Sequence, residues 1–175
     1  HLTALGMKAA RLAARLSECS PTPDGLEEVE FLFSANPGQP LKPLGKVASG
    51  GELSRVSLAI QVICARNLTV PSLVFDEVDV GVGGGVAEIV GRLLRELGQH
   101  AQVLCITHQP QVASQGHQHW QVHKIQGDDT THTRIQGLDE TARVEELARM
   151  LGGVEITEST LTHAREMLDK GQRVA

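Results

Sequence analysis

The chain has 175 residues, a net charge of −5 and a hydrophobic content of 41%, which fit one globular domain with a real core, or at most two small ones. Only 2% of the residues are aromatic and none is Tyr, so the stacking platforms that bind single-stranded nucleic acids are scarce. The negative charge argues against a surface that binds nucleic acid throughout, although it leaves room for a local basic patch. Because there is no signal peptide and no bilayer-length apolar stretch, we expect a cytoplasmic protein that does not engage a membrane.

The cysteines and the first residue also bear on the kind of protein. Cys19, Cys64 and Cys105 are an odd number without CxxC spacing. Cys64 and Cys105 lie in apolar segments, so we expect them to be small, reduced residues of the core. The chain opens at His1 without an initiator methionine and directly enters apparent structure, which indicates a fragment or a processed chain.

The first forty residues predict one strand, and they do not decide between helix and strand for the segment before it. Residues 2–19 are rich in Ala, Leu and Arg, as helices are, but their apolar residues fit strand alternation equally well. Residues 20–25 predict a turn, and residues 29–35 alternate as a strand does. The three prolines and the glycine of residues 36–43 predict a loop without regular structure.

Ser49, Gly50 and Gly51 stand directly before a predicted helix over residues 52–67. A glycine pair at this place frees backbone N–H groups to point at an anion, and the helix N-terminus adds a favourable field. An ordinary Ser N-cap followed by flexible glycines at the helix start fits the same residues, and it is the more frequent case for so short a motif. The buried face of this helix is predicted to consist of Leu53, Val56, Ile60 and Ile63.

Residues 72–79 form a short apolar run that ends in two adjacent carboxylates, Asp76 and Glu77. The run predicts a buried strand of a parallel sheet, and ligands of open α/β folds bind at the carboxyl edge of such strands. Carboxylates there suit a hydrated magnesium ion and the activation of a water molecule. A strand end followed by a solvated acidic turn is the alternative.

A second strand is predicted over residues 102–107, after a helix over residues 86–97 that is closed by glycine. Strand, helix and strand at this spacing predict a right-handed βαβ crossover. The crossover would place His108, at the end of the second strand, on the same sheet edge as Asp76 and Glu77.

The remainder predicts a hairpin of residues 119–126 and 131–137, then helices over residues 143–151 and 157–168, with Thr157 as the N-cap of the last. Four histidines could line the hairpin, but their spacing matches no known metal motif, and a solvated polar face is favoured over a metal site. They are His117, His119, His123 and His132.

The three motifs, taken in order, resemble the C-terminal lobe of an ABC-type ATPase head. Ser49-Gly-Gly-Glu52 is similar to the signature motif, Asp76-Glu77 to Walker B and His108 to the switch histidine. Glu52 and Val78, where membrane transporter subunits typically have Gln and Pro, resemble the SMC and DNA-repair branch. Longer matches to bacterial SMC-like double-strand-break repair ATPases occur at residues 36–40, 46–55, 75–81, 107–113, 116–119 and 146–153.

This resemblance spans residues 5–168 and implies an α/β fold, a mainly parallel sheet flanked by helices, with β-hairpins. It also implies that residues 8–19 are a strand. Asp76 would hold Mg²⁺, through water, Glu77 would polarise the attacking water, and His108 would sense the γ-phosphate of ATP. The signature residues would contact the ATP of a partner subunit in a homodimer of ATP-sandwiched heads; they are Ser49, Gly50, Gly51 and Glu52.

Two features of the acidic loop stand apart from these roles. Many SMC-type heads carry an Asp in the loop after Walker B, and that position is Gly83 here. The cross-subunit contact of that Asp is therefore not expected in this chain. Asp79 is expected to shape the loop rather than to take part in chemistry.

No Gly-x-x-x-x-Gly-Lys-Ser/Thr occurs in the sequence, so nothing here is expected to cradle the α- and β-phosphates of ATP. The resemblance implies that the N-terminal Walker A lobe of the same protein does so, with a coiled coil between the lobes, and that the isolated chain hydrolyses ATP negligibly. It also implies contact with DNA at the nucleoid, since the basic residues themselves are scattered. A non-hydrolytic α/β interaction module is the alternative function, and a transporter-type ATPase is a weaker one.

Overall fold

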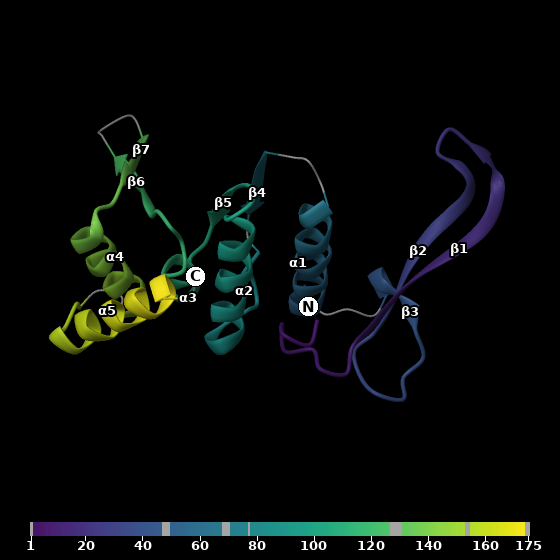
Figure 1. The fold of residues 1–175 in the computed structure, drawn as a ribbon, viewed down its shortest axis with the longest axis horizontal. Helices are drawn as coiled ribbons and strands as arrows, with labels where there is room; N and C mark the ends of the chain where they lie inside the picture. Colours follow the sequence, from purple (N-terminus) through teal and green to yellow (C-terminus); the bar gives the residue numbers. More distant parts are fainter. Residues whose placement is uncertain are drawn as a thin grey trace. The chain divides into compact units, whose positions relative to one another are not determined.

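The computed structural model describes residues 2–46, 50–67, 71–76, 78–126, 131–152 and 155–173 (Figure 1). The chain separates into two compact units. The first comprises His1–Asn67 with Val80–Val82, and the second comprises Leu68–Asp79 with Gly83–Ala175.

The first unit contains a long antiparallel hairpin of β1 (Arg11–Thr22) and β2 (Gly25–Ser34). Leu16 pairs with Val29 in its register, so alternation, not helix propensity, decides this segment. The strand that the resemblance implied is confirmed, and the helical alternative is wrong. The predicted loop over residues 36–43 is wrong at its end, because β3 (Lys42–Pro43) pairs with β2 before a short 3₁₀ turn, η1 (Leu44–Lys46).

The signature helix α1 (Gly50–Asn67) begins two residues earlier than predicted. Its buried side chains only partly match the predicted face, since Leu53 is 42% exposed and Ile63 is 47% exposed. The helix is apolar on more than one side, so the spacing of its apolar residues could not single out the face that packs. Cys64 is exposed as well, contrary to its predicted place in the core. Among the side chains of α1 that the structure describes, those that are buried are Val56, Leu58, Ala59 and Val62.

The second unit is built on a pair of parallel strands, β4 (Ser72–Asp76) and β5 (Gln102–Ile106), joined by helix α2 (Gly84–Leu97). Phe75 pairs with Cys105 on the more buried face of this pair, and α2 packs on β5. Strand, helix and strand follow the predicted order. Among the described residues the other face is bare, because three of its apolar side chains are more than half exposed: Val74, Leu104 and Ile106.

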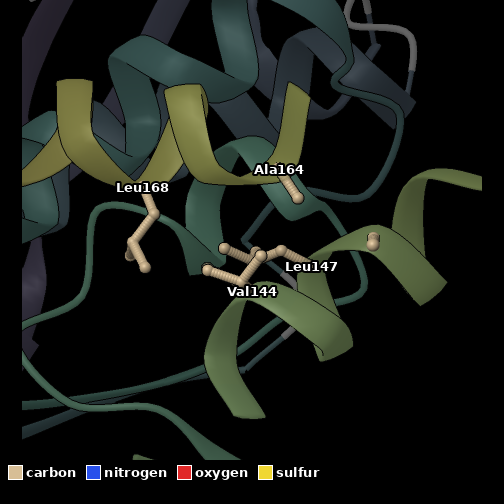
Figure 2. Packing of buried hydrophobic residues seen from close by; sticks show 6 residues of the cluster. Val144, Leu147, Ala164 and Leu168 are labelled. Atoms are coloured by element: carbon tan, nitrogen blue, oxygen red, sulfur yellow. The ribbon is translucent and has the colours of Figure 1, made fainter. Parts of the chain in front are cut away.

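The rest of this unit consists of the short helix α3 (Pro110–Ala113), a hairpin of β6 (Trp120–Gln126) and β7 (Thr131–Gly137), and helices α4 (Glu140–Gly152) and α5 (Glu158–Arg173). Both predicted helices are present, and Thr157 caps α5 as predicted, since its hydroxyl accepts a hydrogen bond from the Thr160 N–H at 3.2 Å. Figure 2 shows the apolar contact between α4 and α5, where Leu147 and Leu168 lie in one buried cluster.

The turn after α3 is held by charged side chains from two helices. Arg95 of α2 donates to the Gln115 carbonyl at 2.7 Å, and Arg143 of α4 donates to the Gly116 carbonyl at 2.7 Å. Lys170 of α5 also forms an ion pair with Glu88 of α2 at 2.8 Å. Hydrogen bonds that involve a charged partner are stronger than neutral ones. They seat the segment that follows β5 on the helical layer. Within the described ranges, no helix combines the length and the apolar character that a membrane crossing requires.

Cys105 should resist alkylation in the folded chain at pH 8, whereas the exposed Cys64 should react. Burial, followed by the negative charges of Asp79 and Asp76, raises the pKa of the Cys105 thiol from 9.0 to about 12. The thiolate is the reactive form, so little of it exists at pH 8. Mass spectrometry of the chain and of Cys64→Ser after iodoacetamide treatment would locate the modified cysteine; equal labelling of Cys64 and Cys105 would contradict the assignment.

Because the Cys105 thiol in the folded state keeps a proton that the unfolded state loses above pH 9.0, the free energy of unfolding should fall as the pH rises from 9.0 towards about 12.

Substitution by Asp should be tolerated at Gly83 and should destabilise the fold at Gly84. Gly83 is the N-cap of α2 with an extended backbone (φ −155°, ψ 173°), and a Cβ there would meet nothing within 4 Å. Gly84 has a φ of +56°, a conformation that disfavours L side chains. Gly83→Asp should raise the free energy of unfolding by a few tenths of a kcal/mol, and Gly84→Asp should lower it by about 1 kcal/mol. Chemical denaturation of the two variants compares one side chain in adjacent positions; equal effects would refute this account of the loop.

Candidate functional site

The register of the parallel strands brings two predicted site residues to one edge of the sheet. Asp76, the last residue of β4, pairs with Ile106, the last residue of β5, and His108 follows two residues later. Because the strands run in the same direction, both chain ends leave the sheet at its carboxyl edge. The predicted juxtaposition of Asp76 and His108 is therefore confirmed. Glu77, the predicted catalytic carboxylate, lies outside the described residues.

The chemistry of this edge fits a magnesium ion. The Asp76 side chain is exposed at the strand end, so its oxygens can reach a hydrated ion. Mg²⁺ prefers oxygen ligands and usually keeps several waters while it binds one or two carboxylates and substrate phosphates. Within the described ranges, no group of three or more His, Cys, Asp or Glu side chains is placed to bind a metal ion. Asp76 can therefore contribute one ligand to a site of the magnesium type, whereas the described hairpin histidines form no metal cluster.

Asp79 lies closer to this site than the sequence suggested. Its side chain is completely buried, and one carboxylate oxygen, Oδ2, accepts a hydrogen bond from the Thr107 hydroxyl. The other oxygen, Oδ1, is 3.8 Å from Nδ1 of His108. We predicted a loop-shaping role for Asp79 and did not single out Thr107. A signal was present, since Thr107 and His108 directly follow the neighbouring strand and so lie at the same sheet edge as the loop that follows β4.

The His108 ring is otherwise open to ligands, because its side chain is 69% exposed. Its second nitrogen, Nε2, lies 3.2 Å from the side-chain amide nitrogen of Gln109. The Gln109 backbone N–H donates to the Thr107 hydroxyl at 2.9 Å, which fixes the turn that carries the histidine. An exposed ring on a fixed turn suits contact with a bound phosphate.

The signature residues belong to the first unit, whereas Asp76 and His108 belong to the second. Gly50, Gly51 and Glu52 form the first turn of α1, so the predicted glycine pair lies inside the helix start and not before it. The positive end of the helix dipole favours an anion at this turn. Ser49 lies outside the described residues.

A pocket of about 760 Å³ occurs elsewhere in the second unit, at the base of the β6–β7 hairpin. Its lining includes His119, Trp120 and Arg143 but none of the predicted site residues. Burial, together with the charge of Arg143, lowers the pKa of His119, which keeps this ring neutral near pH 7. This pocket is therefore separate from the acidic edge.

Comparison with known proteins relates the chain to one group by sequence. No protein-family model matches it. The DNA repair protein RecN of Vibrio cholerae is 54% identical over 166 residues, which are 94% of this chain and 30% of that protein. RecN of Xylella fastidiosa is 52% identical over 173 residues, or 97% of this chain and 31% of that protein. RecN of Bacillus subtilis is 46% identical over 153 residues, or 87% and 27%. The chain thus spans about a third of the length of these relatives.

Solved structures relate it to one fold. One similar structure comes from work on the ATP-driven dimerisation and DNA-stimulated activation of SMC ATPases. It matches with a TM-score of 0.58 and 18% identity, over 87% of this chain and 89% of the other. The Smc head domain of Pyrococcus yayanosii matches with a TM-score of 0.62 and 21% identity, over 83% and 27%. The predicted α/β head fold is confirmed. By sequence the chain is similar to a segment of the RecN DNA repair proteins, and its fold is similar to that of SMC head domains.

Proposed function

We propose that this chain is the C-terminal lobe of an SMC-like ATPase head that acts in DNA double-strand-break repair, and that it completes ATP sites whose phosphates other residues hold. The observation that carries the proposal is the shared carboxyl edge of β4 and β5, where Asp76 and His108 leave adjacent parallel strands. The sequence relatives carry the name DNA repair protein, and the structural relatives are ATPase heads.

The residues divide the work of phosphoryl transfer, which requires charge neutralisation and an oriented water more than covalent help. Asp76 would hold Mg²⁺ through water, and the ion would supply neutralisation of the phosphate charge. Glu77 holds and polarises the attacking water. His108 contacts the γ-phosphate from the neighbouring strand end. Because phosphoryl transfer needs no covalent enzyme intermediate, these three side chains are what this chain contributes to the site once the nucleotide is in place.

Another part of the protein holds that nucleotide. The sequence contains no Walker A loop, so the α- and β-phosphates are bound by an N-terminal lobe of the same protein. The bare face of the β4–β5 pair supports this assignment, because parallel sheets are normally covered on both faces. Val74, Leu104 and Ile106 on that face are 64%, 53% and 58% exposed. Covering each of them is worth roughly 1 to 2 kcal/mol of association free energy.

The signature residues serve a second ATP, bound by the partner subunit, so that two heads close on two nucleotides. Ser49 and the N–H groups of Gly50 and Gly51 contact its γ-phosphate, and Glu52 completes the motif. ATP binding thus closes the heads and hydrolysis releases them, in a homodimer that acts on DNA at the nucleoid. The Asp that other SMC-type heads place across the dimer is replaced by Gly83, where the open space around the residue would admit it.

Mixing the chain with the N-terminal lobe of a RecN relative tests this proposal. We expect a one-to-one complex that doubles in mass on addition of ATP and Mg²⁺, measured by light scattering after size exclusion. Leu104→Asp should weaken formation of the one-to-one complex at least tenfold, because it places a charge on the covered face. Ser49→Arg should leave that complex intact and abolish only the doubling.

The controls separate the alternatives. Asp24→Asn changes an exposed carboxylate at the β1–β2 turn and should have no effect on either step. A complex that forms but never doubles with ATP would instead favour the non-hydrolytic interaction module. Failure of the wild-type chain to bind the lobe at all would contradict the assignment of the bare face.

A further inference from the structure

We propose that Asp79 is a positioning residue that fixes the orientation and the tautomer of His108. The inference deepens the proposed function and rests on it in one respect, the contact between His108 and a nucleotide. Asp79 is completely buried, yet no cationic side chain among the described residues forms an ion pair with it apart from the approach of His108. A buried carboxylate is costly unless its oxygens are satisfied, so its surroundings constrain it strongly.

The Thr107 hydroxyl sets the direction of the carboxylate. This hydroxyl accepts the Gln109 N–H at 2.9 Å, so its own proton is free to point at Oδ2 of Asp79. With Oδ2 engaged, Oδ1 faces the imidazole ring at 3.8 Å from Nδ1. No hydrogen-bond donor in the described part of the chain reaches Oδ1. The His108 ring therefore faces a carboxylate oxygen, Oδ1, that is held in one position and still lacks a hydrogen-bond donor.

The other side of the ring points to the same proton position. The amide nitrogen of Gln109, as the side chain is oriented, lies 3.2 Å from Nε2 and can only donate. Nε2 is then an acceptor, and the proton of the neutral ring resides on Nδ1, towards Asp79. Catalytic hydrogen bonds in ligand-free proteins are often long and tighten when substrate binds, so 3.8 Å suits a contact that closes with the nucleotide. A phosphate oxygen can only accept, so Nε2 meets the phosphate as a donor in the doubly protonated ring, in which Nδ1–H stays directed towards Asp79.

Asp79→Asn should invert this arrangement. The Thr107 hydroxyl still needs an acceptor, so the amide oxygen of Asn should take the place of Oδ2 and turn its NH₂ group towards His108. That group can only donate, which makes Nδ1 the acceptor and moves the ring proton to Nε2. Thr107→Ser keeps the hydroxyl and should keep the wild-type tautomer. Asp24→Asn is the matched control, because it removes an exposed carboxylate by the same substitution.

Imidazole ¹⁵N NMR of the full 175-residue chain, at a pH where His108 is neutral, measures the tautomer directly. We expect the Nδ1–H form in the wild type, Thr107→Ser and Asp24→Asn, and the Nε2–H form in Asp79→Asn. An Nε2–H ring in the wild-type chain would overturn the proposal even if the Asn variant did not fold. The same tautomer in the wild type and a folded Asp79→Asn would overturn it as well.

Steady-state kinetics of the chain in complex with a Walker A lobe give the functional half of the test. Asp79→Asn should lower kcat roughly tenfold to a hundredfold, while the KM for ATP changes by less than about twofold, because orientation matters after ATP has bound. An unchanged kcat in an active complex would rule out the positioning role. A wild-type complex without hydrolysis would count against the proposed function, and the NMR result would still decide how Asp79 and His108 are related.

Discussion

The parallel register of β4 and β5 is the constraint on which the site depends. Pairing Asp76 with Ile106 makes the two strands end level, so the residues that follow them emerge side by side. A shift of the register by one residue would turn the alternating side chains over and move Asp76 away from the His108 turn. Because α2 joins strands that run in the same direction, this geometry follows from the βαβ connection and needs no contact between Asp76 and His108 themselves.

The same pair of strands supports the proposal that this chain is one lobe of a larger head. Its more buried face carries Phe75, while its other face leaves Val74, Leu104 and Ile106 exposed. Each strand also has an edge that no strand among the described residues pairs. Open edges and bare apolar faces are features that proteins cover. A lobe that supplies the missing layer would complete the core and the ATP site in one step, which links the stability of the head to the assembly of its chemistry.

Sequence reasoning predicted the parts of the molecule in which local pattern and long-range packing agree. The short apolar strands, the glycine-bounded helix between them and the polar residues at their ends all have clear local signals. It failed where distant residues decide. The strand pairing of Lys42 depends on Phe33 across a proline-rich loop, and the exposure of Cys64 depends on which side of an apolar helix is covered. Asp79 could not be assigned from its neighbours, because its partners, Thr107 and His108, lie 28 and 29 residues further along the chain. Ser49 and Glu77 lie outside the described residues, so their roles stay predictions.

We propose that this chain completes ATP sites and does not contain one. Steady-state ATP hydrolysis by the purified chain, alone and together with a Walker A lobe, tests this directly. We expect negligible phosphate release by the chain alone and sustained release by the pair, lost in Glu77→Gln. Robust hydrolysis by the chain alone that disappears in Glu77→Gln would contradict it.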